Sequence, residues 1–116
     1  MDVYQAFFSL KPGVGDLEFA DALARFLDHL KAGGRIVSWR LMRRKLGLGP
    51  AGLGDFHLLI ETRDLAQLDA AFTTVSTRGE PVESLHFDVN SKVFGISFLL
   101  TRDFPDPHRE SGAERF

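Results

Sequence analysis

The stretch 54–62, which reads Gly-Asp-Phe-His-Leu-Leu-Ile-Glu-Thr, constrains the fold of this chain more than any other segment. Side chains alternate between the two faces of a β-strand, so this pattern predicts a strand whose faces differ. One face is purely apolar and is expected to lie under helices, whereas the other mixes polar and apolar groups. The apolar face carries Phe56, Leu58 and Ile60, and the mixed face carries Asp55, His57, Leu59 and Glu61. Whatever covers the mixed face is expected to decide what the protein does.

Three other segments alternate in the same way and predict strands, namely Val3–Leu10, Arg35–Leu46 and Lys92–Thr101. The first is apolar on both faces, which is typical of a central strand. The second exceeds the usual strand length of about 5–6 residues, so we expect it to overhang its neighbours and pair with something else. In the second strand we place Val37, Trp39, Leu41 and Arg43 against the helices, and Ile36, Ser38, Arg40, Met42 and Arg44 on the opposite face. The last strand has Phe94, Ile96, Phe98 and Leu100 on one face, and Val93, Gly95, Ser97 and Leu99 on the other.

Residues 16–32 and 64–77 repeat apolar side chains at helical spacing and predict two helices. Asp16 and Asp64 are the expected N-caps, because a short acidic side chain can accept from the free backbone N–H groups of a first turn. Residues 80–90 are less regular and predict a short helical turn packed on the body. The apolar stripe of the second helix is expected to consist of Leu65, Leu68, Phe72 and Val75.

Length and composition fit one domain, since 116 residues that are 44% hydrophobic can bury one real core. We assign residues 1–103 to this domain and residues 104–116 to an irregular C-terminal tail. With a formal net charge of -2, nothing favours nucleic acid or an anionic membrane as a partner. The absence of cysteine excludes disulfides, thiol nucleophiles and zinc–thiolate sites. Neither a signal peptide nor an apolar run of about 20 residues is visible, so a cytoplasmic protein is the default expectation.

A glycine pattern in the loop after the second strand resembles a dinucleotide-binding motif. Gly47, Gly49 and Gly52 have the spacing G-x-G-x-x-G. That motif needs a helix directly after it, whose N-terminus holds the pyrophosphate. Here Pro50 interrupts the segment and another strand follows, so we expect a wide hairpin loop and no nucleotide.

The predicted order strand, helix, strand, strand, helix, strand is that of an α+β, ferredoxin-like sandwich. Four antiparallel strands then take the order 4-1-3-2, with both helices on one face. The other face would be exposed although it carries several apolar side chains, and an exposed patch of that kind is usually an interface. These side chains are Val3, Phe7, Leu59, Val93 and Leu99. A second copy that lays its sheet on the first is the simplest cover, so we expect a homodimer.

In this element order and in its two-sided strands, the chain resembles the dimeric α/β-barrel superfamily over roughly residues 2–101. That superfamily includes stress-responsive barrel-domain proteins, antibiotic-biosynthesis-type monooxygenases and muconolactone isomerases. The resemblance is not carried by any catalytic motif. Within the superfamily the chain is most similar to a small group of uncharacterised bacterial proteins, which implies a dimeric barrel and no particular activity.

Between two such sheets, the mixed strand faces would line a small-molecule pocket. The predicted ligand-binding set is Gln5, Phe7, Arg40, His57, Leu59 and Ser97. His57 can act as a general acid or base near neutral pH, and Arg40 can hold a carboxylate or an enolate oxygen. The alternative reading of His57 is a hydrogen-bonded packing residue. Gly95 is expected to leave room for a ligand to approach the backbone.

Metal and cofactor sites are only weakly indicated. Asp55 with His57, and His86 with Asp88, are loose pairs without a convergent three-ligand spacing. The resemblance makes haem with His57 as its axial ligand conceivable, because some relatives of the superfamily bind haem, yet such a ligand has no signature of its own. We therefore expect no metal and no cofactor.

Three functions stay open on this basis. The first is a homodimer that binds a small, partly apolar organic molecule, either between sheet and helices or between the sheets. The second is a cofactor-independent monooxygenase or isomerase in which His57 and Arg40 carry the reaction. The third is a purely structural or stress-response interaction role with a solid interior.

Overall fold

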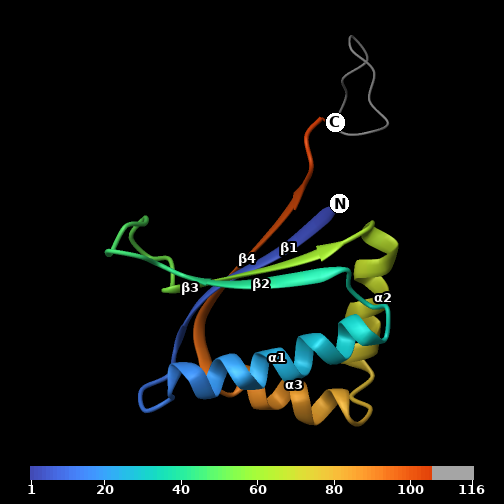
Figure 1. The fold of residues 1–116 in the computed structure, drawn as a ribbon, viewed down its shortest axis with the longest axis horizontal. Coiled ribbons are helices and arrows are strands. Elements are labelled where there is room, and N and C mark those ends of the chain that lie inside the picture. Colours follow the sequence, from blue (N-terminus) through green and yellow to red (C-terminus); the bar gives the residue numbers. More distant parts are fainter. Residues whose placement is uncertain (106–116) are drawn as a thin grey trace.

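The computed structural model describes residues 1–105, which form one four-stranded sheet with its helices on one side (Figure 1). Every strand pair is antiparallel, and the sheet order is β2-β3-β1-β4. This order is the predicted 4-1-3-2 read from the other edge, so the ferredoxin-like arrangement is confirmed. The elements are β1 (Asp2–Leu10), α1 (Asp16–Ala32), β2 (Ser38–Arg43), β3 (Phe56–Thr62), α2 (Leu65–Ser76), α3 (Val82–Asn90) and β4 (Val93–Arg102).

The two central strands, β1 and β3, are two-sided as their alternation predicts. Phe8 pairs with Phe56 across the ladder, and both side chains are buried on the helix side. Phe19 of α1 is 0% exposed and completes a three-ring cluster with them, with centroid separations of 5.3 to 5.9 Å. Such tilted and offset ring pairs stabilise a core beyond the area that they bury. The cluster anchors α1 to the centre of the sheet.

The predicted length of β2 is wrong, whereas the predicted facing of its side chains is confirmed within the strand. Ile36, predicted on the face away from the helices, is instead 3% exposed in the core, because it precedes the strand and does not follow its alternation. The strand covers Ser38–Arg43, six residues, and only one further hydrogen bond extends the ladder at each end, from Val37 N to Glu61 O and from Arg44 N to Asp55 O. It cannot overhang because Leu46 has a positive φ of 56° and turns the chain into the β2–β3 loop. Within residues 1–105, β2 therefore forms no long arm at this edge of the sheet.

A bulge changes the facing of β4 partway along the strand. Val93 pairs with Leu10 and Phe94 with Ser9, but Ser97 pairs with Phe7, so β4 carries one extra residue. Gly95 has a φ of +64°, which suits the left-handed residue of a glycine bulge. Val93 is therefore buried in the core, and Phe94 lies on the open face, which corrects the predicted facing of both. The positive φ gives Gly95 a backbone role in the bulge, and its role in ligand approach stays a prediction.

The helices depart from prediction in three respects. Gly15, not Asp16, is the N-cap of α1, whereas Asp64 caps α2 and accepts from Gln67 N at 2.8 Å as expected. Segment 82–90 is a helix of nine residues, α3, longer than the predicted turn. In α2 the buried side chains are Gln67, Leu68 and Ala71, while Leu65 and Phe72 are 48% and 47% exposed.

Gln67 explains why the apolar period of α2 predicts its buried face poorly. Its amide donates to Gly34 O at 3.0 Å and accepts from Arg63 N at 2.8 Å, so a polar side chain is satisfied inside.

None of the helices within residues 1–105 is long and apolar enough to cross a membrane. Phe104 and Pro105 follow β4 outside any helix or strand, and the rest of the predicted tail, residues 106–116, lies outside the described residues.

Candidate functional site

All six residues of the predicted ligand-binding set lie on the sheet face away from the helices, the open face. Residues directly opposite one another in an antiparallel pair share a face. Phe7 is opposite His57 on one side and Ser97 on the other, and Gln5 is opposite Leu59. Leu59 is in turn opposite Arg40. The open face therefore brings together Gln5, Phe7, Arg40, His57, Leu59 and Ser97, and no helix within residues 1–105 covers it (Figure 1).

His57 is held by a chain of hydrogen bonds that crosses three strands. Its Nε2 lies 2.7 Å from Gln5 Oε1, and the Gln5 amide nitrogen donates to Thr101 Oγ1 at 2.8 Å. The Phe7 ring stacks on the imidazole with a centroid separation of 4.2 Å and an interplanar angle of 14°. Each contact limits rotation of the imidazole, so His57 has one orientation on the open face.

The same chain decides which ring nitrogen of His57 carries the proton. Because Gln5 Oε1 can only accept, Nε2 must donate to it. In the neutral ring Nδ1 is then the unprotonated nitrogen, and no side chain or backbone group of the described residues bonds to it. Burial lowers the pKa of His57 below 6.5, because the charged form loses hydration. The neutral imidazole therefore presents a basic Nδ1 on the open face.

Arg40 shares the face with His57 but does not contact it. His57 is opposite Met42 and Arg40 is opposite Leu59, so the two residues are diagonal neighbours. Diagonal Cβ atoms lie about 7–8 Å apart, a separation that a bound group can bridge. The Arg40 side chain is exposed and has no hydrogen bond or ion pair within residues 1–105. A hollow of about 210 Å³ lies beside His57 and is bordered by Phe7, Met42 and the β2–β3 loop.

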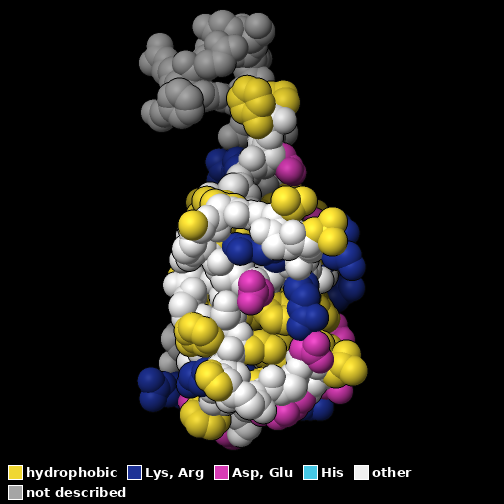
Figure 2. All heavy atoms as spheres, turned by 90° about the vertical axis from the view of Figure 1, so that its left-hand side faces the viewer, with side chains coloured by type: hydrophobic (Ala, Val, Ile, Leu, Met, Phe, Trp, Pro, Cys, Tyr) yellow, Lys and Arg dark blue, Asp and Glu magenta, His cyan; other side chains and the backbone are white. Residues whose placement is uncertain are grey.

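A much larger cleft, about 1010 Å³, lies between the helices and the sheet, one of the two places considered for a ligand from the sequence, although its lining residues were not predicted. The main helix–strand packing joins α1 to β2 and α2 to β3, which leaves the β4 side of the sheet with little cover. As a result the β4 side chains that face the helices stay accessible: Ile96 is 37%, Phe98 62% and Leu100 52% exposed. Figure 2 looks at one end of the molecule and shows hydrophobic side chains inside an opening, with charged side chains above it and on its right-hand side.

The apolar and the polar residues that line the cleft come from different parts of the fold. The sheet and α1 contribute apolar groups, with the Tyr4 hydroxyl as the exception, and the polar groups come from residues 69–90. Tyr4 stacks on Phe98 at 5.6 Å and meets Phe72 edge-on at 5.1 Å. Burial raises the pKa of Tyr4, so its hydroxyl is neutral at physiological pH. The polar lining residues are Asp69, Thr73, Ser76, Arg78, Glu83, His86 and Asn90.

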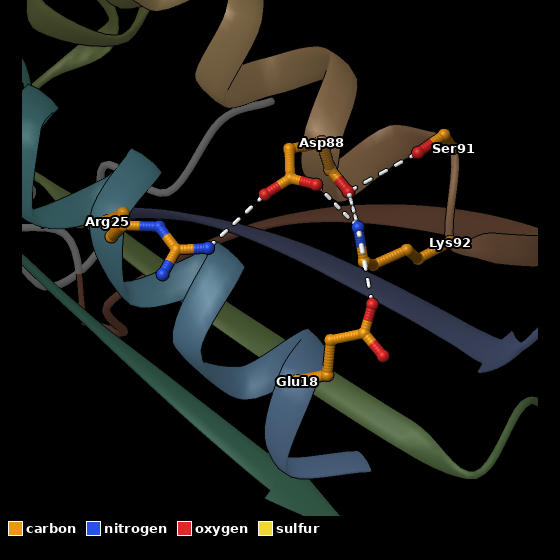
Figure 3. A network of polar contacts seen from close by, with 5 residues as sticks. All are labelled: Glu18, Arg25, Asp88, Ser91 and Lys92. Carbon is orange, nitrogen blue, oxygen red and sulfur yellow. Dashed lines mark hydrogen bonds and ion pairs between the residues drawn. The ribbon is translucent and has the colours of Figure 1, made fainter. Parts of the chain in front are cut away.

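A second group of polar residues, which joins α1 to the α3–β4 junction, is structural (Figure 3). Lys92 Nζ lies 2.5 Å from Asp88 Oδ1, 2.9 Å from the Asp88 carbonyl oxygen and 4.0 Å from Glu18 Oε1. Arg25 adds a 3.3 Å contact to the other Asp88 oxygen. The Lys92 side chain is only 14% exposed. The charges in this network satisfy one another, so it acts as a clamp between the helices.

Replacing Lys92 by methionine is expected to lower the free energy of unfolding by about 1–3 kcal/mol, because hydrogen bonds to a charged group are lost. Lys92 and Arg25 lower the pKa of Asp88 from 3.8, Lys92 contributing most. A carboxyl with a lowered folded pKa stabilises the protein above its unfolded pKa. The deficit of the variant, measured by urea denaturation, should therefore shrink as the pH falls below 3.8. The exposed Lys31→Met change is the control, and an equal loss in both variants would contradict the clamp.

The described residues contain no group of three or more His, Asp or Glu side chains placed to hold a metal ion. The histidine–carboxylate pairs considered in the sequence, 55 with 57 and 86 with 88, gain no third ligand within residues 1–105. The geometry offers two places for chemistry, the His57 region of the open face and the cleft on the helix side.

Solved structures with this fold come from several organisms. A protein from Arabidopsis thaliana matches with a TM-score of 0.72 at 5% identity, covering 91% of this chain and 98% of that one. A dimeric ferredoxin-like protein of unknown function from Jannaschia sp. CCS1 matches with a TM-score of 0.64 at 15% identity, over 88% and 98% of the chains. A dimeric ferredoxin-like protein of unknown function from Thermobifida fusca YX matches with a TM-score of 0.60 at 13% identity, over 86% and 88%. These similarities show the fold alone.

No curated protein matches the chain in sequence. One family model matches it over residues 1–116, and that model describes a family of unknown function, DUF6614.

Proposed function

The chain belongs to DUF6614, a family of unknown function, and we propose that it is a homodimer whose protomers each bind a small, partly apolar organic molecule. The observation that carries this proposal is the cleft of about 1010 Å³ on the helix side. Small-molecule sites are concave and mostly apolar, with a few polar groups that orient the ligand. The aromatic wall of Tyr4, Phe72 and Phe98 and the polar rim of residues 69–90 match that description.

The homodimer is supported by the open face. Phe7 and Leu59 are only partly buried on it, and Leu99 and Phe94 are 45% and 50% exposed. A monomer that left this face in water would expose apolar side chains of three neighbouring strands among the polar ones. The solved structures from Jannaschia and Thermobifida are described as dimeric. Light scattering at pH 7.5 tests the dimer, and a particle of 13.0 kDa instead of twice that mass would contradict it.

Binding of the fluorescent apolar anion 8-anilinonaphthalene-1-sulfonate tests the cleft. We expect the native protein to bind it and Phe98→Ala to raise its dissociation constant about tenfold, because a large ring is removed from the wall. Leu99→Ala is the matched control, since Leu99 is the next residue of β4 and lies on the opposite face. Native mass spectrometry of freshly purified protein provides a second measurement, which detects a co-purified compound.

Two outcomes would contradict this function. If Phe98→Ala bound the dye as well as the unchanged protein while Leu99→Ala did not, the site would lie on the open face. If the folded protein bound no dye and carried no compound, the structural or stress-response interaction role would be favoured. Circular dichroism of each variant shows whether the fold is retained.

A second candidate function is a cofactor-independent monooxygenase or isomerase. It is supported by one observation, the placement on the same sheet face of a basic His57 Nδ1 and of Arg40, which has no partner within residues 1–105. A substrate with an acidic C–H next to a carbonyl would suit such a base and cation. The two sites lie on opposite sides of the sheet, so His57→Gln should leave dye binding in the cleft unchanged.

A further inference from the structure

The open face holds an imidazole whose protonation would add a charge without adding a bond. His57 uses Nε2 to donate to Gln5 at 2.7 Å, and this bond is available to both the neutral and the charged ring. Protonation therefore occurs at Nδ1, which has no partner within residues 1–105. The ring lies between Phe7, on which it stacks, and Met42, which is opposite it on β2. Its immediate neighbours are thus apolar on two sides.

We propose that His57 makes the dimer sensitive to pH, such that its protonation drives the two protomers apart. This inference rests on the proposed face-to-face dimer and adds a regulatory property to it. When a second sheet covers the open face, water leaves the surroundings of Nδ1. A positive charge at that atom would then lose its hydration, and the described residues of its own protomer give it no hydrogen-bond acceptor, which disfavours the associated state.

Among the described residues, no charged group pairs with His57 as a counter-ion. On β2 its diagonal neighbours are Arg40 and Arg44, which are both cationic; Arg44 is held by the carbonyl oxygens of Pro50 and Leu53. On β3 the carboxylates of the same face are Asp55 and Glu61, and neither forms a hydrogen bond or ion pair with the imidazole. From β1 the neighbours Gln5 and Phe7 are neutral. Within residues 1–105, no helix packs on this face to add another charge.

The direction of the pH effect follows from where the proton binds more tightly. Burial already lowers the pKa of His57 below 6.5 in the free protomer. Closer burial in the dimer lowers it further, so the free protomer takes up protons before the dimer does. Dissociation is then favoured as the pH falls below the pKa of the free protomer. Because each dimer contains two copies of His57, the dissociation constant should rise by up to about 100-fold per pH unit in that range.

Analytical ultracentrifugation from pH 7.5 to pH 5 measures the dissociation constant directly. We expect a dimer at pH 7.5 that weakens steeply on acidification, and a nearly constant dissociation constant for His57→Gln, which keeps a donor for Gln5 without a titrating group. His86→Gln is the matched control, because His86 lies on α3 against Phe26 and away from the open face. That control should behave like the unchanged protein.

The outcomes separate this inference from the dimer itself. A dimer whose dissociation constant does not change with pH would overturn the role of His57 and leave the proposed dimer intact. A monomer at every pH would contradict the dimer and the inference together. Persistent acid dissociation in His57→Gln would assign the effect to other groups and overturn the inference. If that variant does not fold, an NMR titration of the His57 ring in the unchanged protein decides, since the ring should titrate only as the dimer dissociates.

Discussion

Replacing Gly54 by alanine is expected to destabilise the protein by about 3 kcal/mol or more, at the upper end of the cost of overpacking. A Cβ at this position would overlap the carbonyl group of Phe8 and lie 2.6 Å from its Cα. The overlap is with backbone, so no side chain can rotate away. Phe8 cannot shift either, because its ring is 4% exposed and belongs to the three-ring cluster. Urea denaturation measures the loss.

Gly79→Ala is the matched control for this prediction. A Cβ at Gly79 would meet only Thr77 Oγ1, at an ordinary contact distance of 3.9 Å. Its φ lies outside the left-handed region, so alanine there should be neutral or stabilising by a few tenths of a kcal/mol. If Gly54→Ala lost less than about 1 kcal/mol, the close approach of β1 and the start of β3 would be wrong.

Phe19→Ala should lower the free energy of unfolding by about 3–5 kcal/mol, the range for truncating a fully buried phenylalanine. Phe19 is 0% exposed and touches the rings of Phe8 and Phe56, which belong to the two central strands. Its removal leaves a cavity between α1 and the sheet that the neighbouring rings can fill only by moving together. Thermal and urea denaturation measure the loss.

Leu17 provides the control on the same helix, because its side chain is 78% exposed. Leu17→Ala should change the free energy of unfolding by less than about 0.5 kcal/mol. A similar loss in both variants would show that helix propensity, and not the ring cluster, determines the effect. Phe19 also lines the cleft, so a Phe19→Ala protein that remains folded should have altered dye binding.

Much of the fold could be predicted from the sequence, because strands and helices each repeat their apolar side chains at a short, characteristic spacing. The alternation in β1 and β3 predicts two-sided central strands, and the helical period of residues 16–32 matches α1. The facing of Arg40 and His57 also follows from alternation, once β2 is paired with β3. These properties are local, since a side chain's face depends only on its position in its own strand.

Other features of the candidate sites depend on contacts between segments that are far apart in the sequence. The bulge at Gly95 exists because β4 must fit β1 on both sides of Phe8, and it exchanges the faces of Val93 and Phe94. The bond between His57 and Gln5 joins residues 52 positions apart and depends on the register of β1 against β3. Alternation identifies which residues share a face but not which of them bond.

The sequence alone predicts the strand at residues 56–62 and the face of the sheet on which His57 lies. The cleft on the other side of the sheet was decided only by the tertiary structure. The sequence predicts that its apolar residues belong to the core. Nothing in their spacing shows that the helices pack toward β2 and β3 and leave Phe98 and Leu100 accessible to solvent. The physical reason is that the local backbone sets the direction of a side chain, whereas its burial depends on how elements distant in the sequence pack against it.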